Sequence, residues 1–231
     1  MILVGCCIGP GGRYEQIAGP SLERVLRPDD RLVLVEGADG ICAAYNSVLH
    51  TARALPECEG VLLVHDDVEL VGDDVRDLLS AALAEPRVGV VGVAGGRDLV
   101  WGKWWSGRVL AGRTNDTASS RSLGSPAADV DAVDGCLMLV APPALHLTFD
   151  ADGFPGFHGY DVDLSLQARS AGLRVVTRPI GYRHLDKGSL GDRAAFETAM
   201  RALEAKWPTW IRPLSRRERV TRKLAGAARR G

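Results

Sequence analysis

The stretch DADGFPGFHGYDVDLSLQARSAG, residues 150–172, joins a glycine- and aromatic-rich loop to the start of a helix. Apolar residues begin at Val162, and Gly172 stands where a helix of about three turns needs a left-handed C-cap. Asp161 and Asp163 fall in the first turn, where a carboxylate faces the positive end of the helix dipole. We therefore expect Asp161 to lie at the edge of a pocket and to stay ionised at neutral pH.

Outward from this stretch, apolar runs alternate with segments of helical periodicity. The predicted strands cover residues 2–8, 32–35, 60–64, 88–93, 133–140 and 173–177, and the predicted helices cover residues 20–26, 41–53, 75–83, 160–171 and 192–207. This alternation predicts an α/β fold with a mostly parallel sheet and helices on both faces. Ligands of such sheets bind beyond the carboxyl ends of the strands.

Composition and charge limit the function classes. The 231 residues are 46% hydrophobic and 25% charged, with a net charge of −1, so a single globular domain over residues 1–211 is expected, with no nucleic-acid partner. Residues 95–130 are polar and rich in glycine, and they show no periodicity. The tail at residues 212–231 is strongly basic, which is typical of a solvated terminal helix or of a peripheral contact with an anionic membrane.

The cysteines and the N-terminus indicate the compartment. The five cysteines form no C-x-x-C pair and lie mostly in or beside apolar runs, which favours free thiols in a reducing cytoplasm. The first residues lack the basic start of a signal peptide, and no apolar run approaches the roughly 18 residues that a membrane span needs.

Several blocks in the second half carry a family resemblance. In order, they are DGCLMLV at 134–140, FD at 149–150, FPGF at 154–157, YDVDL at 160–164 and GYRHLDKGS at 181–189. Together they resemble a family 2 glycosyltransferase, although Tyr160 stands where that family usually has Glu and Gln167 where it often has Arg. The resemblance implies a GT-A-like (Rossmann-like) fold. It also implies inverting transfer of a sugar from a nucleotide-diphosphate donor to a hydroxyl acceptor. Residues 1–98 would form the nucleotide-binding half and residues 99–211 the acceptor half.

The same resemblance implies a metal site where the third predicted strand ends. His65 and Asp67 take the two positions of the family's Asp-x-Asp motif, and His184 stands near a histidine that completes the site. A divalent ion there would neutralise the donor diphosphate. Oxygen ligands suit Mg²⁺ or Mn²⁺, and the imidazoles favour Mn²⁺. The alternative is a polar strand end whose acids face solvent.

The remaining site predictions follow from the matched blocks. Asp161 is the expected general base, and Asp163 is expected to be structural, capping the helix or pairing with an arginine. Trp104 and Trp105, with Trp101, form either an acceptor platform or a plain cover over the sheet. The predicted substrate-binding residues are Glu36, Asp39, Asn46, Asp66, Trp104, Trp105, Asp134, Gly135, His158, Tyr160 and Lys187.

Two other functions remain open on the sequence. A sugar-phosphate nucleotidyltransferase would share the sheet and a metal-binding Asp. It would, however, need a lysine near a glycine-rich loop after the first strand, and residues 9–13 supply only the glycines. A relative that binds nucleotide sugar or glycan without turnover would explain the departures at His65 and Tyr160.

Overall fold

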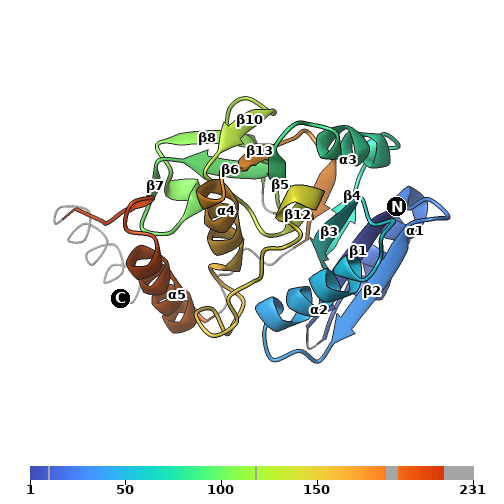
Figure 1. Ribbon diagram of the computed structural model, residues 1–231, viewed down its shortest axis with the longest axis horizontal. Coiled ribbons are helices and arrows are strands. Elements are labelled where there is room, and N and C mark those ends of the chain that lie inside the picture. Colours follow the sequence, from blue (N-terminus) through green and yellow to red (C-terminus); the bar gives the residue numbers. More distant parts are fainter. Residues whose placement is uncertain (10, 118, 186–191, 216–231) are drawn as a thin grey trace.

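The computed structural model describes residues 1–9, 11–117, 119–185 and 192–215, and it shows one central sheet with helices on both faces (Figure 1). Lys187 and most of the predicted basic tail lie outside these residues. In chain order the elements are β1 (Ile2–Ile8), η1 (Tyr14–Gln16), α1 (Ala18–Val25), β2 (Arg31–Glu36), α2 (Ile41–Arg53), β3 (Gly60–His65), β4 (Val68–Leu70), α3 (Val75–Leu83), β5 (Val88–Gly92), β6 (Ala94–Arg97), β7 (Leu99–Val100), η2 (Trp104–Ser106), β8 (Val109–Asn115), β9 (Ser120–Ser122), β10 (Ala128–Val130), β11 (Ala132–Val133), β12 (Leu137–Val140), η3 (Pro142–Ala144), α4 (Tyr160–Ser170), β13 (Arg174–Thr177), β14 (Tyr182–His184), α5 (Arg193–Lys206) and β15 (Ile211–Arg212).

The main sheet is mostly parallel, as the sequence predicts. Within the described ranges its seven strands lie in the order β10-β13-β5-β12-β3-β1-β2. β1 pairs in parallel with β2 and β3, and β13 pairs in parallel with β5. β12 runs antiparallel between β3 and β5, and β10 runs antiparallel to β13. Five of the seven strands therefore share one direction.

The predicted strand at 133–140 is wrong, because the structure divides it. Ala132–Val133 pairs with β6 in a second sheet, whereas Leu137–Val140 enters the main sheet. The chain turns between them at Asp134, whose Oδ1 accepts a hydrogen bond from the backbone N–H of Cys136 at 2.9 Å. This turn places Asp134 and Gly135 at the carboxyl end of β3.

The segment 95–130 is also more regular than its sequence indicates. Within the described residues, β11, β6, β8 and β9 form a four-stranded second sheet. A Cβ atom at Gly95 would lie 2.5 Å from the carbonyl oxygen of Ala132, and one at Gly96 would lie 2.1 Å from that of Trp104. Glycines are needed at these close approaches, and they remove the alternation of side chains that identifies a strand in a sequence.

The two faces of the main sheet are buried in separate apolar clusters. Along β1, Leu3 packs with Tyr45 of α2 on one face, and Ile2 packs with Leu22 of α1 on the other. Helices α2 and α4 cover the first face, and α1 and α3 cover the second (Figure 1). Burial on both faces explains why the strands appear in the sequence as continuous apolar runs.

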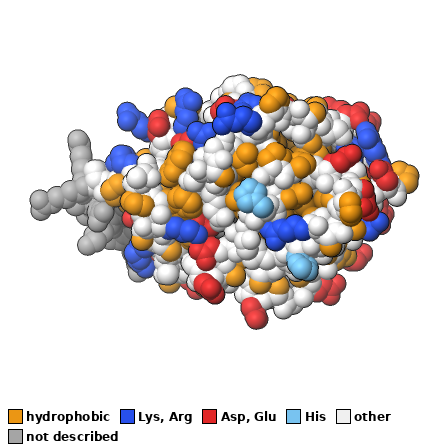
Figure 2. All heavy atoms as spheres, viewed as in Figure 1, with side chains coloured by type: hydrophobic (Ala, Val, Ile, Leu, Met, Phe, Trp, Pro, Cys, Tyr) orange, Lys and Arg blue, Asp and Glu red, His pale blue; other side chains and the backbone are white. Residues whose placement is uncertain are grey.

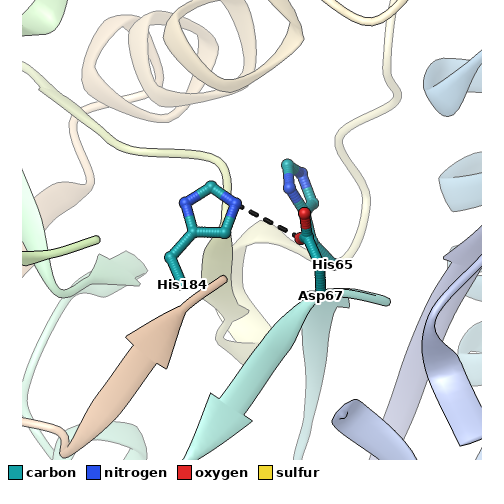
Figure 3. A group of neighbouring side chains, drawn as sticks. All are labelled: His65, Asp67 and His184. Carbon is teal, nitrogen blue, oxygen red and sulfur yellow. Dashed lines mark ion pairs between the residues drawn. The ribbon is translucent and has the colours of Figure 1, made fainter. Parts of the chain in front are cut away.

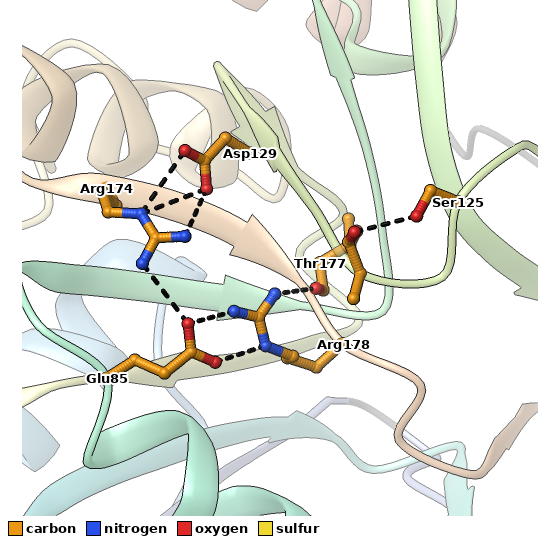
Figure 4. Close-up of polar contacts among 7 residues, drawn as sticks. Glu85, Ser125, Asp129, Arg174, Thr177 and Arg178 are labelled. Carbon is orange, nitrogen blue, oxygen red and sulfur yellow. Dashed lines mark hydrogen bonds and ion pairs between the residues drawn. The ribbon is translucent and has the colours of Figure 1, made fainter.

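A charged network ties the edge strand β10 and its neighbour β13 to the chain before β5 (Figure 4). Glu85 lies between two arginines: Arg178 donates from Nε at 2.6 Å and Arg174 donates from Nη1 at 3.3 Å. Arg174 also donates from Nη2 to Asp129 of β10 at 2.7 Å. The hydrogen bond from Arg178 outweighs burial and lowers the pKa of Glu85.

On the face shown in Figure 2, the described residues form no strongly charged patch. Acidic and basic side chains both occur across the side shown in Figure 2, as the near-zero net charge leads us to expect. All five cysteines lie in the described part of the chain and are free thiols, as predicted. In the described residues, no helix has both the length and the apolar character needed to cross a membrane.

We predict that the ion pair between Arg76 and Asp30 stabilises the start of β1. The Asp30 carboxylate is fully buried, accepts from Arg76 Nε at 2.7 Å and also accepts from the Ile2 N–H at 2.7 Å. Arg76→Met leaves that carboxylate without its counter-charge, so we expect the free energy of unfolding to fall by about 3–5 kcal/mol. Urea denaturation is the measurement.

Arg27→Met is the matched control. Arg27 pairs with Asp77 at 2.6 Å, but both side chains are exposed, so this change should cost no more than about 1 kcal/mol. Equal losses in the two variants would contradict a special role for the buried pair.

Candidate functional site

A pocket of about 320 Å³ lies where β3 ends and α4 begins. Its walls come from both halves of the chain. The residues that line it include His65, Asp67, Trp104, Trp105, Asp134, Gly135, His158, Tyr160, Asp161, His184 and Phe196. The position agrees with the rule that ligands bind beyond the carboxyl ends of parallel strands.

Three potential metal ligands meet in this pocket. His65 ends β3, Asp67 follows it before β4, and His184 ends β14, which pairs antiparallel with β4. Their donor atoms all lie within 4.8 Å of one another. Figure 3 shows His184 directed at Asp67, with Nε2 lying 3.2 Å from Oδ1. The trio predicted from the sequence is thus brought together by two adjacent strands.

The protonation of Asp67 and His65 suits a cation. Burial acts to raise the pKa of Asp67, but the hydrogen bond and charge of His184 outweigh it, so the pKa is lowered. Burial, with the nearby His184, lowers the pKa of His65. An ionised carboxylate and a neutral imidazole are the forms that bind metal. The residues present therefore fit a divalent ion such as Mn²⁺, which accepts both oxygen and imidazole ligands.

Asp116 is a part of the site that the sequence analysis missed. Its Oδ1 lies 3.8 Å from Nδ1 of His184, on the side of the ring opposite Asp67. A carboxylate near the second nitrogen of a histidine ligand orients the ring and its tautomer. Asp116 falls in the segment whose sequence shows no periodicity, so only the pairing of that segment with β14 reveals it.

Asp161, the expected general base, lies on the same pocket beside Asp134. Burial, with the negative charge of Asp134, raises the pKa of Asp161 to about 7. The expectation that the helix dipole keeps this carboxyl firmly ionised is therefore wrong. The N–H groups of the first turn and of Gly135, which donates to Oδ2 at 3.2 Å, do favour the ionised form, but burial outweighs them. A base with a pKa near the working pH is well suited to proton transfer.

Asp163 has the structural role that the sequence predicts, with other partners. Its side chain is 1% exposed, and it accepts from the Trp207 indole N–H at 2.7 Å and from Lys206 at 2.9 Å. Neither an arginine nor a helix cap is involved. Asp163 anchors α5 to α4.

Tyr160 faces the metal trio. Its hydroxyl lies 2.6 Å from Nε2 of His65, and the side chain is buried. Gly135 makes this position available, because a Cβ atom there would lie 2.2 Å from the Tyr160 hydroxyl. Two of the residues that depart from the resembled family pattern, His65 and Tyr160, are therefore in direct contact.

An aromatic wall closes the side of the pocket beyond Asp161. Trp105 stacks on Phe196 of α5 with ring centroids 6.0 Å apart, and His158 meets Phe196 edge-on at 5.3 Å. Trp104 is buried, whereas Trp105 is 41% exposed. Of the three tryptophans of the predicted platform, Trp105 has a surface available to a ligand, whereas Trp101 and Trp104 pack in the core.

The predicted nucleotide contacts at the first half are less well placed. Glu36, which ends β2, and Asp39, which follows it, are both exposed and do not line this pocket. The amide of Asn46 is occupied: it donates to the carbonyl oxygen of Phe149 at 2.8 Å and accepts from the Phe149 N–H at 2.9 Å. Asn46 thus anchors the loop before α4. This structural role accounts for an asparagine on this helix without any contact to a nucleotide.

Asp66 holds the loop that contains Arg13, a residue of the site that the sequence analysis missed. Its Oδ2 accepts from the backbone N–H groups of Gly9 and Arg13, at 3.4 and 3.3 Å, and so holds the loop after β1. The Arg13 side chain donates to the carbonyl oxygen of Leu185 at 2.5 Å, and its Nη2 lies 3.9 Å from Asp67. The positively charged side chain of Arg13 therefore lies beside the three potential metal ligands.

Comparisons with known proteins agree with this geometry. A model of the "Glycosyltransferase like family" matches residues 28–186. The streptomycin biosynthesis protein StrF of Streptomyces griseus is 31% identical over 182 residues, covering 78% of this chain and 64% of that protein. The product of ATP synthase subunits region ORF 6 of Fuscovulum blasticum is 29% identical over 166 residues, covering 69% of this chain and 64% of that protein. The chain thus spans under two thirds of the length of these relatives.

Two solved structures share the fold. The mannosyltransferase PcManGT from Pyrobaculum calidifontis, in complex with GDP-Man and Mn²⁺, has a TM-score of 0.52 at 14% identity and covers 98% of this chain and 79% of its own. Protein A197 from STIV has a TM-score of 0.51 at 13% identity, covering 81% and 87%. At these identities the likeness concerns the fold alone, and it confirms the predicted α/β architecture with a mostly parallel sheet. Since the family model matches more than half of its residues, the chain belongs to the glycosyltransferase-like family.

Proposed function

We propose that this protein is an inverting, metal-dependent glycosyltransferase that moves a sugar from a nucleotide-diphosphate donor to a hydroxyl acceptor. The observation that carries the proposal is that one pocket holds both a trio of potential metal ligands and a carboxyl whose pKa is about 7. The GDP-Man and Mn²⁺ bound to the mannosyltransferase neighbour support these classes of donor and ion.

In this proposal each residue has a defined task. Asp161 accepts the proton of the acceptor hydroxyl as that oxygen attacks the anomeric carbon, and the nucleotide diphosphate leaves from the opposite face of the sugar. His65, Asp67 and His184 would hold the divalent ion, which when bound stabilises the charge on the leaving diphosphate. Residues 1–98 bind the nucleotide, and the aromatic wall of residues 99–211 receives the acceptor.

The raised pKa of Asp161 favours this proposal over a binding-only relative. Burial and the charge of Asp134 raise the pKa of this carboxyl to about 7, which costs folding stability. Perturbed pKa values of this kind are concentrated at catalytic sites. The nucleotidyltransferase alternative needs a lysine at the loop after β1. The residue found there is Arg13, positioned beside the ion site.

We predict that Asp161→Asn transfers sugar at least about 100-fold more slowly, because it keeps the shape of the side chain and removes the base. Initial rates with donor and acceptor give the measurement. Asp163→Asn is the matched control on the same helix: it should lower stability, since it disturbs the bonds to Lys206 and Trp207, and leave turnover close to that of the parent.

The parent and Asp161→Asn should also differ in how their stability depends on pH. Because the pKa of Asp161 is about 7 in the folded protein and 3.8 as its ordinary value, the parent binds the proton more tightly when folded. Its stability therefore falls as pH rises from about 4 to about 7, whereas Asp161→Asn lacks this loss. Transfer by the parent should rise over the upper part of that range, as the base ionises. An Asp161→Asn protein with full activity would show that the base is another residue.

We predict that nucleoside diphosphate binding depends on a divalent ion held through Asp67. Calorimetry with UDP or GDP, in Mn²⁺ and in chelator, should show tight binding only with the metal, and Asp67→Asn should abolish the difference. Asp77→Asn removes another ion-paired carboxylate, remote from the pocket, and serves as the control. Equal affinity with metal and chelator would contradict the metal site.

We predict that Arg13 contacts the phosphates of the donor. Loss of a hydrogen bond to a charged group costs about 1.5–3 kcal/mol, so Arg13→Gln should weaken UDP or GDP binding about 10- to 100-fold. Binding of uridine or guanosine, which lack phosphate, should not change. Arg24→Gln is the control, because Arg24 likewise donates to a backbone carbonyl, that of Leu70, away from the pocket. An equal loss for nucleoside and nucleotide would indicate a loop defect instead.

A further inference from the structure

Two tyrosines of the core differ in what their hydroxyls contact. Tyr45 of α2 and Tyr160 of α4 meet edge to face, with ring centroids 5.9 Å apart, and both are buried. The Tyr160 hydroxyl lies 2.6 Å from Nε2 of His65. The Tyr45 hydroxyl has no hydrogen-bond partner in the part of the chain that the structure describes. One tyrosine therefore touches the proposed ion site, and its neighbour does not.

The contact with Tyr160 limits how His65 can bind an ion. A neutral imidazole has one N–H donor and one nitrogen with a free lone pair. Nε2 is already engaged at hydrogen-bond distance, so Nδ1 is the nitrogen left for a cation shared with Asp67 and His184. Nδ1 carries a lone pair only when the proton is on Nε2, and Nε2–H then donates to the Tyr160 oxygen.

The surroundings of the phenol favour this direction of donation. The negative charges of Asp161 and Asp134 both act on Tyr160. Because a negative charge attracts a hydroxyl proton, we expect the Tyr160 proton to turn toward these carboxyls and the oxygen lone pairs to face His65. Gly135 closes the other side, since a Cβ atom there would lie only 2.2 Å from the hydroxyl oxygen. The hydroxyl is thus confined between Gly135 and the imidazole.

We propose that Tyr160 is a positioning residue for His65: it accepts a hydrogen bond from Nε2–H and so fixes the tautomer that presents Nδ1 to a divalent ion. The inference rests on the metal dependence in the proposed function, and it gives Tyr160 no contact with donor or acceptor. Groups that bond the second nitrogen of a histidine ligand typically change metal affinity 10- to 100-fold when removed.

The first test measures binding of Mn²⁺ alone, from the electron paramagnetic resonance signal of the free ion. We expect Tyr160→Phe to weaken binding about 10- to 100-fold. Tyr45→Phe, which removes only the unbonded hydroxyl of the neighbouring ring, should bind as the parent does. Parent-like affinity in Tyr160→Phe overturns the inference and leaves the proposed function intact. A parent that binds no Mn²⁺ overturns both the inference and the metal dependence of the proposed function.

The second test takes its deciding measurement on the parent protein. Nitrogen NMR of the metal-free parent, with ¹⁵N-labelled histidine, reports which ring nitrogen carries the proton, and His65→Gln identifies the His65 signals among the five histidines. We expect the proton on Nε2 of His65 in the parent and in Tyr45→Phe, and a mixture of tautomers in Tyr160→Phe. A proton on Nδ1 in the parent would mean that Tyr160 donates instead, and would overturn the inference.

Discussion

The antiparallel insertion of β12 between β3 and β5 is the constraint on which the pocket depends. Because β12 runs against β3, its first residues lie beside the end of β3: Leu137 is opposite Val64, and the N–H of His65 donates to the carbonyl oxygen of Cys136 at 3.0 Å. The turn before β12 therefore lies next to the three potential metal ligands. Gly135 in that turn donates to Asp161 and brings the start of α4 to the same place.

In this arrangement the pKa values of two carboxylates in one pocket shift in opposite directions. Asp67 lies against His184 and has a lowered pKa, whereas Asp161 lies against Asp134 in a buried position and has a raised one. The first suits a permanent ligand for a cation, and the second suits a group that takes up a proton near neutral pH. Environment, more than residue type, thus assigns the two roles.

The second sheet and α5 complete the pocket on the side proposed to receive the acceptor. β8 carries the chain to Asp116 beside His184, and α5 supplies Phe196, on which Trp105 stacks. Asp163 holds α5 against α4 through Lys206 and Trp207. These contacts join the two helices that contribute Asp161 and Phe196 to the pocket.

Much of this protein follows from local pattern. The helix at residues 41–53 and the left-handed Gly172, with φ of 76°, are as the sequence predicts, because helical periodicity and C-capping are properties of neighbouring residues. The grouping of His65 and Asp67 at a strand end is also visible locally, while the role of His184 came from the order of blocks along the chain.

Only the tertiary structure decided the rest, because it depends on contacts between distant segments. The pKa of Asp161 depends on its burial and on the charge of Asp134, and not on the helix dipole alone. The amide of Asn46 bonds to the loop at Phe149, 103 residues away. Arg13, Asp116 and the contact between Tyr160 and His65 carry no sequence signal of their own. Local sequence therefore determined which elements form, and the packing of those elements determined what each polar side chain faces.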